Sequence, residues 1–234
     1  VEGDLAALPA PVARWMRRIG VVGRPRPATV EVAFDIRIRG GADEAWMEGQ
    51  GEQFTRIDPP VRLFFMTARK AGLPVHVLHR YANGGATMEG RLLGLVPLFR
   101  HEGETMTRSE TVTLLNDLFF LAPAGLLDAG VEWEEIDDRR AGVVWTHAGH
   151  TVRAEVWFDE AGDLVDFASD DRWQMDRDPP ERARWQTPFS AYDTLEGVRL
   201  PVAGQATWGE GDAAWPYVEL AVKRVTYGGG PGRR

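Results

Sequence analysis

The chain has 234 residues, of which 44% are hydrophobic, and its formal net charge is −8. This length and hydrophobic content suffice for a sizeable core in one soluble domain, and the acidic balance argues against nucleic acid or an anionic membrane surface as a partner. The sequence has no cysteine, which excludes disulfides, cysteine-ligated zinc, iron–sulfur clusters and thiol nucleophiles. The compartment stays open between cytoplasm and cell envelope, because a signal or anchor could precede Val1.

The first predicted element is an amphipathic helix within residues 1–20. From Asp4 to Ile19, apolar side chains recur at three- and four-residue steps, and arginines occupy the other side. Gly20 and Gly23 favour an end to the helix. We expect this helix to pack against the rest of the domain.

Strand patterns dominate residues 29–93. Residues 29–39 alternate between large apolar side chains and smaller or charged ones, which is typical of a half-buried β-strand. Turn-forming residues separate the apolar runs that follow, and Asn83-Gly84-Gly85 has the composition of a tight hairpin turn. These residues therefore predict a first set of antiparallel strands.

Residues 107–127 are expected to hold a second helix. Thr107 and Glu110 have the spacing of a helix capping box, and Pro123 is expected to stop the helix. Between residues 110 and 121, apolar side chains cover well over half of the circumference. Such a helix must be buried on several sides, which predicts a helix inside or across the mouth of a curved sheet.

Residues 131–227 return to short apolar runs separated by turns, which predicts a second set of strands that includes one continuous strand at 185–192. Residues 228–234 are expected to be a loose tail. The two sets together give about eleven strands. The predicted fold is mainly β (α+β): a curved antiparallel sheet or half-open β-barrel, formed as a single domain over residues 1–234.

Four segments carry a resemblance to a known family: LPAPV at residues 8–12, GRLLGLVP at 90–97, FDEAG at 158–162 and GVRLP at 197–201. In these segments the chain resembles an uncharacterised bacterial family, a domain of unknown function, that is akin to the LolA-like lipoprotein carriers and lipid-binding lipoproteins. The resemblance implies an incomplete antiparallel barrel, closed by helices, around an apolar cavity. It supplies no catalytic residues to assign.

The aromatic content favours binding of an apolar molecule. Nine Trp, ten Phe and six Met are many for this length, and several predicted strands are apolar on both faces, so the sheet must be covered on both sides or line a cavity. A filled core is the alternative, since small barrels often have no void. If a cavity is present, we expect its ligand, a lipid-like or other apolar small molecule, to contact six residues: Phe34, Phe65, Leu115, Phe119, Trp145 and Phe158.

An enzyme that uses the same cavity is the second hypothesis. The residues to test are Asp170, Arg172, His79 and Tyr81; Asp170 and Arg172 fall on the same face of one predicted strand and could pair there. A buried Asp–Arg pair is more often structural than functional. A structural or interaction domain with a filled core is the third hypothesis.

Metal and cofactor binding have little support in the sequence. His147 and His150 flank a predicted tight turn, so both could reach one ion, but a third ligand would have to come from elsewhere. Ordinary polar residues beside a hairpin are the more common interpretation. We expect no cofactor, no nucleic-acid partner and no membrane-spanning segment in this chain, and the sequence leaves the oligomeric state open.

Overall fold

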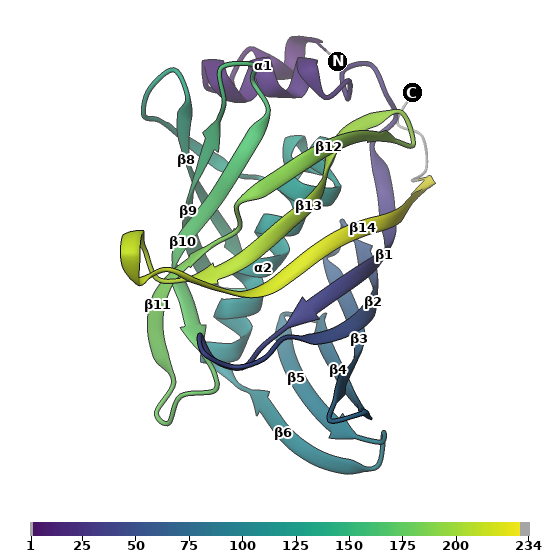
Figure 1. The fold of residues 1–234 in the computed structure, drawn as a ribbon. Coiled ribbons are helices and arrows are strands. Elements are labelled where there is room, and N and C mark those ends of the chain that lie inside the picture. The colour runs from purple at the N-terminus through teal and green to yellow at the C-terminus, as the bar shows by residue number, and fades with distance from the viewer. Residues whose placement is uncertain (1, 230–234) are drawn as a thin grey trace.

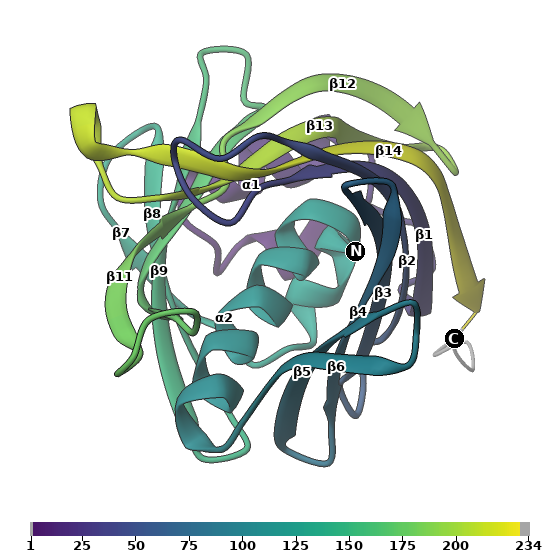
Figure 2. The same ribbon diagram turned by 60° about the horizontal axis from the view of Figure 1, so that its bottom comes forward.

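The computed structural model of the chain describes residues 2–229. A 14-stranded antiparallel sheet curls around one long helix, α2, and a short helix, α1, lies across one end of the curl (Figures 1 and 2). The strand order is β6-β5-β4-β3-β2-β1-β14-β13-β11-β10-β9-β8-β7, and β12 pairs with β13. The predicted class, a curved antiparallel sheet in the form of a half-open barrel, is confirmed.

The elements have the following bounds. The helices are α1 (Ala10–Arg18) and α2 (Glu104–Leu121), with 3-10 turns at Glu2–Leu5, Pro123–Leu127 and Gly211–Ala213. The strands are β1 (Pro27–Ile38), β2 (Met47–Arg56), β3 (Val61–Lys70), β4 (Leu73–Ala82), β5 (Gly85–Leu92), β6 (Val96–Glu102), β7 (Glu132–Glu135), β8 (Arg140–His147), β9 (His150–Phe158), β10 (Leu164–Gln174), β11 (Glu181–Gln186), β12 (Phe189–Leu195), β13 (Val198–Trp208) and β14 (Trp215–Gly229).

The predicted count of about eleven strands is wrong. The edge strand β6 was not expected: it is largely exposed and contains Pro97, so it has neither the apolar period nor the composition of a central strand. The single strand expected at residues 185–192 is two strands, because the chain leaves β11 at Gln186 and enters β12 at Phe189. Residues 228–229 of the expected tail belong to β14, and residues 230–234 lie outside the described residues.

The N-terminal helix is shorter than predicted. It begins at Ala10, after Pro9 as its N-cap, and residues 2–5 form a separate 3-10 turn. A proline disfavours helical backbone in the residue before it, so Pro9 separates the two segments. Trp15 and Met16 of α1 are fully buried beneath it and help to close this end of the barrel.

The central helix α2 begins six residues earlier than the expected start at Glu110. Its N-cap is Gly103, whose φ of 94° is a backbone conformation that favours glycine. The expected capping box is absent within the described residues: the Thr107 hydroxyl donates to the Gly103 carbonyl at 2.9 Å, and Glu110 points into the interior. The expected burial on several sides is confirmed, since fifteen of the helix's residues are buried.

The two strand sets join where β1 pairs with β14. In β1, the predicted alternation holds: Val30, Val32, Phe34 and Ile36 are all buried. The register runs from Pro27 opposite Gly229 to residue 38 opposite residue 218. Within residues 2–229, neither α1 nor α2 combines the length and hydropathy that a membrane crossing requires.

Candidate functional site

A cavity of about 840 Å³ lies between α2 and the concave face of the sheet. Its lining includes residues 38–40 at the end of β1 and residues 175–178 after β10. These segments lie at the end of the barrel opposite α1 (Figure 2). At the other end, α1 and the aromatic core close the barrel (Figure 1). The cavity therefore has one closed end and one end that leads toward the surface.

The sheet provides an apolar wall. Strands β1, β3, β4 and β14 turn alternate side chains inward, which places a continuous apolar surface opposite the helix. Its members include Phe34, Ile36, Met66, Val77, Val218 and Leu220.

The helix provides a polar wall. The α2 residues that line the cavity are Met106, Ser109, Glu110, Thr113, Asn116, Asp117 and Phe120. Steps of three and four residues place them on one face of a helix, so the polar side chains of an otherwise apolar helix form a single stripe.

Arg62 of β3 joins the two carboxylates of this stripe. Its Nε donates to Asp117 Oδ2 at 2.6 Å, and its Nη1 donates to Glu110 Oε2 at 3.1 Å. Its Nη2 donates to Gln53 Oε1 at 3.1 Å, and the Gln53 amide in turn donates to Asp117 Oδ2 at 2.8 Å. The side chains of all three charged residues are at most 8% exposed. Each of the three nitrogens of the buried Arg62 guanidinium thus has a hydrogen-bond acceptor.

Glu110 is the centre of the charge cluster. Besides Arg62, it faces His79 Nδ1 at 3.3 Å and Arg172 Nη2 at 3.6 Å, both measured from Oε1. Burial alone would raise the pKa of Glu110, but His79, Arg62 and Arg172 outweigh burial and hold the pKa of this carboxyl well below its ordinary value. A carboxylate with so low a pKa is a weak general base.

The pKa values of Asp117 and of Arg62 itself are both raised, for different reasons. Burial raises the pKa of Asp117 above its ordinary value, and the attraction of Arg62 offsets only part of that effect. For Arg62, burial lowers the pKa, but the charges of Asp117 and Glu110 outweigh burial, so the pKa is raised and the guanidinium stays charged.

Arg172 of β10 occupies an aromatic corner of the cavity. Its guanidinium lies 4.2 Å from the ring centre of Trp185 and 5.4 Å from that of Trp208. Its Nη1 donates to the Tyr217 hydroxyl at 2.8 Å, and that hydroxyl also accepts a hydrogen bond from Trp185 Nε1 at 3.0 Å. Cation–π contacts and one neutral hydrogen bond therefore hold this cation in place.

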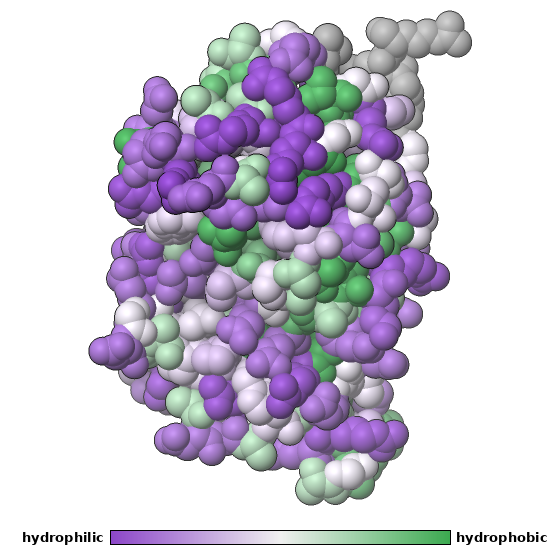
Figure 3. Space-filling model, turned by 45° about the horizontal axis from the view of Figure 1, so that its top comes forward, coloured by the Kyte–Doolittle hydropathy of each residue, from purple (hydrophilic) through white to green (hydrophobic). Residues whose placement is uncertain are grey.

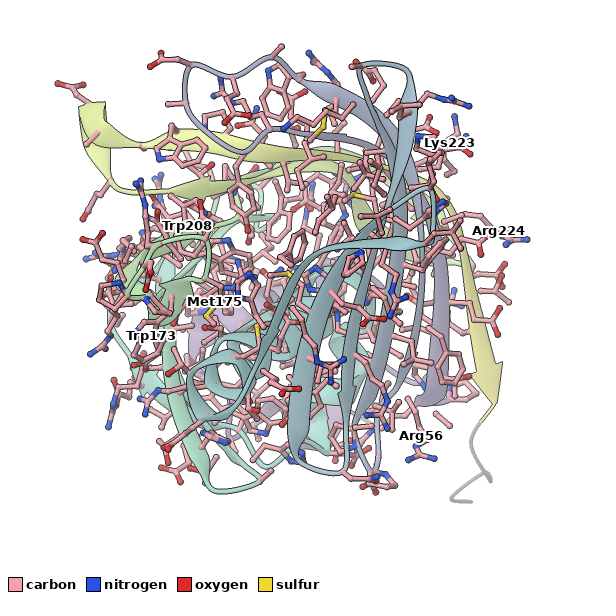
Figure 4. All side chains as sticks on the ribbon, turned by 90° about the horizontal axis from the view of Figure 1, so that it is seen from below. Arg56, Trp173, Met175, Trp208, Lys223 and Arg224 are labelled. Carbon is pink, nitrogen blue, oxygen red and sulfur yellow. The ribbon has the colours of Figure 1, made fainter. Side chains whose placement is uncertain are left out.

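Near the open end the lining becomes mixed. In Figure 4, which looks at the molecule from below, Trp173, Met175 and Trp208 lie on one side of the opening, whereas Lys223 and Arg224 of β14 point outward. Asp176 and Arg177 continue the lining beyond Met175. This rim combines aromatic, thioether and charged groups.

Of the six residues expected to contact a ligand, the structure places one, Phe34, on the cavity wall. Phe65 lies on the outer face of β3, where it is 44% exposed and stacks on His76, so its expected inward placement is corrected. Strand β3 is apolar on both faces, so a period of two cannot tell the inner face from the outer one.

The other four expected contact residues are buried away from the cavity. Leu115 and Phe119 are fully buried in the hydrophobic core, and Phe119 stacks on Trp15 with ring centres 5.8 Å apart. Phe158 also contacts Trp15, and Trp145 donates to the Ala129 carbonyl at 2.8 Å. These residues belong to the packed core.

The four residues singled out for catalysis separate in the structure. His79 and Arg172 line the cavity and meet at Glu110. Tyr81 is fully buried, and its hydroxyl lies 3.3 Å from that of Thr111. Asp170 faces outward and pairs with Arg184, because a register irregularity between Ser169 and residue 172 places Asp170 and Arg172 on opposite faces. The expected Asp170–Arg172 pair is therefore wrong.

The sequence interpretation did not identify Arg62, Glu110 or Asp117 as site residues. A pattern that could have revealed them is the set of polar residues at 109, 110, 113, 116 and 117, which share one face of an apolar helix. Arg62 gives no such pattern, since it falls at one end of a strand that is apolar on both faces.

The candidate metal ligands His147 and His150 pair across the turn at Ala148 and Gly149, as predicted from the sequence. His147 stacks on Trp145 with ring centres 5.3 Å apart. Among residues 2–229, no group of three or more His, Asp or Glu side chains is arranged to hold a metal ion.

Comparisons with known proteins address the family of the chain. A search of curated proteins finds no match. Among solved structures, the chain is similar to a crystal structure from Vibrio parahaemolyticus described as an outer membrane lipoprotein-sorting protein domain, with 10% identity and a TM-score of 0.45 over 88% of each chain. The sequence model described as "Family of unknown function (DUF6544)" matches residues 1–220, which confirms the expected membership in an uncharacterised family. The chain thus belongs to the DUF6544 family.

Proposed function

We propose that this chain binds an elongated apolar small molecule in the cavity between α2 and the sheet, without covalent chemistry. The observation that carries the proposal is the cavity itself, with a volume of about 840 Å³ and an apolar sheet wall. This volume lies within the range of roughly 300–1,000 Å³ that is usual for small-molecule sites. A domain with a filled core does not predict a space of this size.

The shape of the cavity supports an elongated ligand. The lining residues of α2 extend from Met106 near one end of the helix to Phe120 near the other, so the cavity follows most of the helix length. Apolar surface that a ligand buries against the sheet wall stabilises the complex by about 2.5 kcal/mol per 100 Å², before the cost of association.

The polar stripe of α2 fixes the width of the cavity. The hydrogen bonds from Arg62 to Glu110 and Asp117 connect the helix to β3, on the far side of the space. Ion pairs in a nearly dry interior resist separation, because parting them leaves uncompensated buried charge. The cluster therefore holds the helix at a fixed distance from β3.

An uncharged solvatochromic dye, Nile red, tests the proposal. We expect saturable one-to-one binding to the purified chain and at least a tenfold loss of affinity in Leu220→Trp, which fills the cavity. Ala221→Trp is the matched control, since Ala221 is the next residue of β14 and is exposed on the outer face. Native mass spectrometry with organic extraction would then identify any apolar molecule that copurifies.

Two results would contradict the proposal. One is a wild-type chain that does not bind Nile red. The other is a folded Leu220→Trp variant that binds the dye as tightly as Ala221→Trp, which would place the dye elsewhere on the molecule.

A further inference from the structure

The two buried arginines of the cavity differ in how many of their donors are used. Arg62 makes three hydrogen bonds, through Nε, Nη1 and Nη2, to acceptors that include two carboxylates. Arg172 makes one among the described residues, from Nη1 to the neutral Tyr217 hydroxyl. Its Nε is buried without a partner in residues 2–229, and its Nη2 stands 3.6 Å from Glu110, beyond hydrogen-bond distance.

This difference matters because Arg172 is as buried as a core residue. The residue is 9% exposed and lines the cavity. A guanidinium has five N–H donors, and a buried donor left without an acceptor costs free energy. Arg172 therefore has unused hydrogen-bonding capacity at a position where little of its side chain is exposed.

The charges around Arg172 favour an anion as the missing partner. Glu110 also faces Arg62 and His79, at 3.1 Å and 3.3 Å, so its charge is shared among three basic groups. Asp117 is held by Arg62 at 2.6 Å. Arg172 thus has no carboxylate of its own, although two aromatic rings keep its position fixed.

We infer that the ligand of the cavity is an amphiphile with a carboxylate head, which binds the guanidinium of Arg172 beside His79 and Tyr217 while its apolar tail lies along the sheet wall. This inference rests on the proposed function and adds to it the chemical class of the ligand. A carboxylate matches a guanidinium because both are planar and can form two parallel hydrogen bonds.

A set of matched probes separates the head group from the tail. Hexadecanoate and hexadecan-1-ol have the same number of carbon atoms and differ at the head, and each can be titrated at pH 7.5 by displacement of Nile red. We expect the wild-type chain to bind hexadecanoate at least tenfold more tightly than the alcohol, which corresponds to about 1.4 kcal/mol.

Substitution of Arg172 tests whether this residue causes the preference for hexadecanoate over the alcohol. Arg172→Met should lower the affinity for hexadecanoate at least tenfold and change the affinity for the alcohol less than twofold. Arg172→Gln, which keeps a hydrogen-bond donor, serves as a second variant if the first does not fold. Arg184→Met is the matched control, since Arg184 pairs with Asp170 on the outer face and should leave both affinities unchanged.

The possible outcomes separate this inference from the proposed function. Equal affinity of the wild-type chain for acid and alcohol, or an equal loss for both probes in Arg172→Met, would overturn the carboxylate head and leave an apolar site. If the wild-type chain does not bind Nile red, the proposed function itself fails. The wild-type comparison decides the matter even if neither Arg172 variant folds.

Discussion

The packed core and the cavity lie against different faces of the same helix, α2. At the end covered by α1, α2 presents Phe119, whose ring contacts those of Trp15 and Phe167 in a tightly packed core. Another face of the same helix presents Glu110 and Asp117 to the cavity. Figure 3, which brings the α1 end forward, shows a mostly hydrophilic surface over that core, interrupted by small apolar patches.

The difference shows that one element can contribute to a packed core and to a cavity wall at once. The sides of α2 that touch β9 and β10 are apolar and fill space, whereas its polar stripe lines the cavity and is linked to β3 through Arg62. Both regions are buried, so burial alone does not distinguish a core from a site. The distinguishing feature is what each buried side chain contacts.

The largest expected effect comes from removing the link between the two walls. Arg62→Met leaves the buried carboxylates of Glu110 and Asp117 without their shared partner, which should lower the free energy of unfolding by about 3–5 kcal/mol. Urea denaturation monitored by circular dichroism would measure the change. Arg56→Met, at an exposed position on the neighbouring strand, is the control and should be nearly neutral. A loss below about 1 kcal/mol would show that the cluster does not hold the walls together.

A pair of identical substitutions compares the two regions directly. Phe119→Ala removes a fully buried ring from the core, whereas Phe64→Ala removes a partly buried ring that already borders the cavity. We expect Phe119→Ala to lower the free energy of unfolding by roughly 2 kcal/mol more than Phe64→Ala, since it opens a new void. Denaturation curves of the two variants under one set of conditions give the difference, and equal losses would contradict the division into core and cavity.

The smallest expected effect on stability comes from Asp163, which forms an ion pair with Arg18 of α1. Burial alone would raise the pKa of Asp163, but Arg199 and Arg18 outweigh it and lower the pKa to about 2. Because this is below the ordinary value of 3.8, the unfolded chain binds the proton more readily. The ion pairs therefore stabilise the fold above about pH 4, and this contribution is lost as the pH falls toward 2.

The matched variant for this effect is Asp163→Asn. Its deficit in the free energy of unfolding relative to the wild-type chain should be full at pH 6 and should shrink as the pH approaches 2. A deficit that stays constant over this range would show that the carboxylate charge is not what fastens Arg18 of α1 to the sheet.

The fold was predictable where one structural requirement dominated the sequence. The alternation in β1 and the apolar circumference of α2 each follow from burial, so both elements were expected correctly in kind. The edge strand β6 buries little and was missed for that reason. Patterns of burial cannot report a strand that buries almost nothing.

The site was less predictable, because its residues depend on details that no period encodes. Phe64 and Phe65 are adjacent and identical, yet only the first faces the cavity. Asp170 and Arg172 should share a face by simple alternation, but an irregularity in β10 separates them. Glu110 has the spacing of a capping residue and is instead the centre of a buried charge cluster. In each case a three-dimensional contact overrides a valid local pattern.

The pairing of β1 with β14 has a consequence for how the cavity forms. These two strands stand near opposite ends of the described chain, and they join β2–β6 on one side of the sheet to β13–β7 on the other. During synthesis on a ribosome, the edge of β1 that pairs with β14 stays unpaired until almost the entire polypeptide has been made. Such long-range pairing slows folding and leaves an edge open to aggregation in the meantime. The ligand-sized space is thus among the last parts of the molecule to form during synthesis, and a truncation within β14 would remove one of its walls.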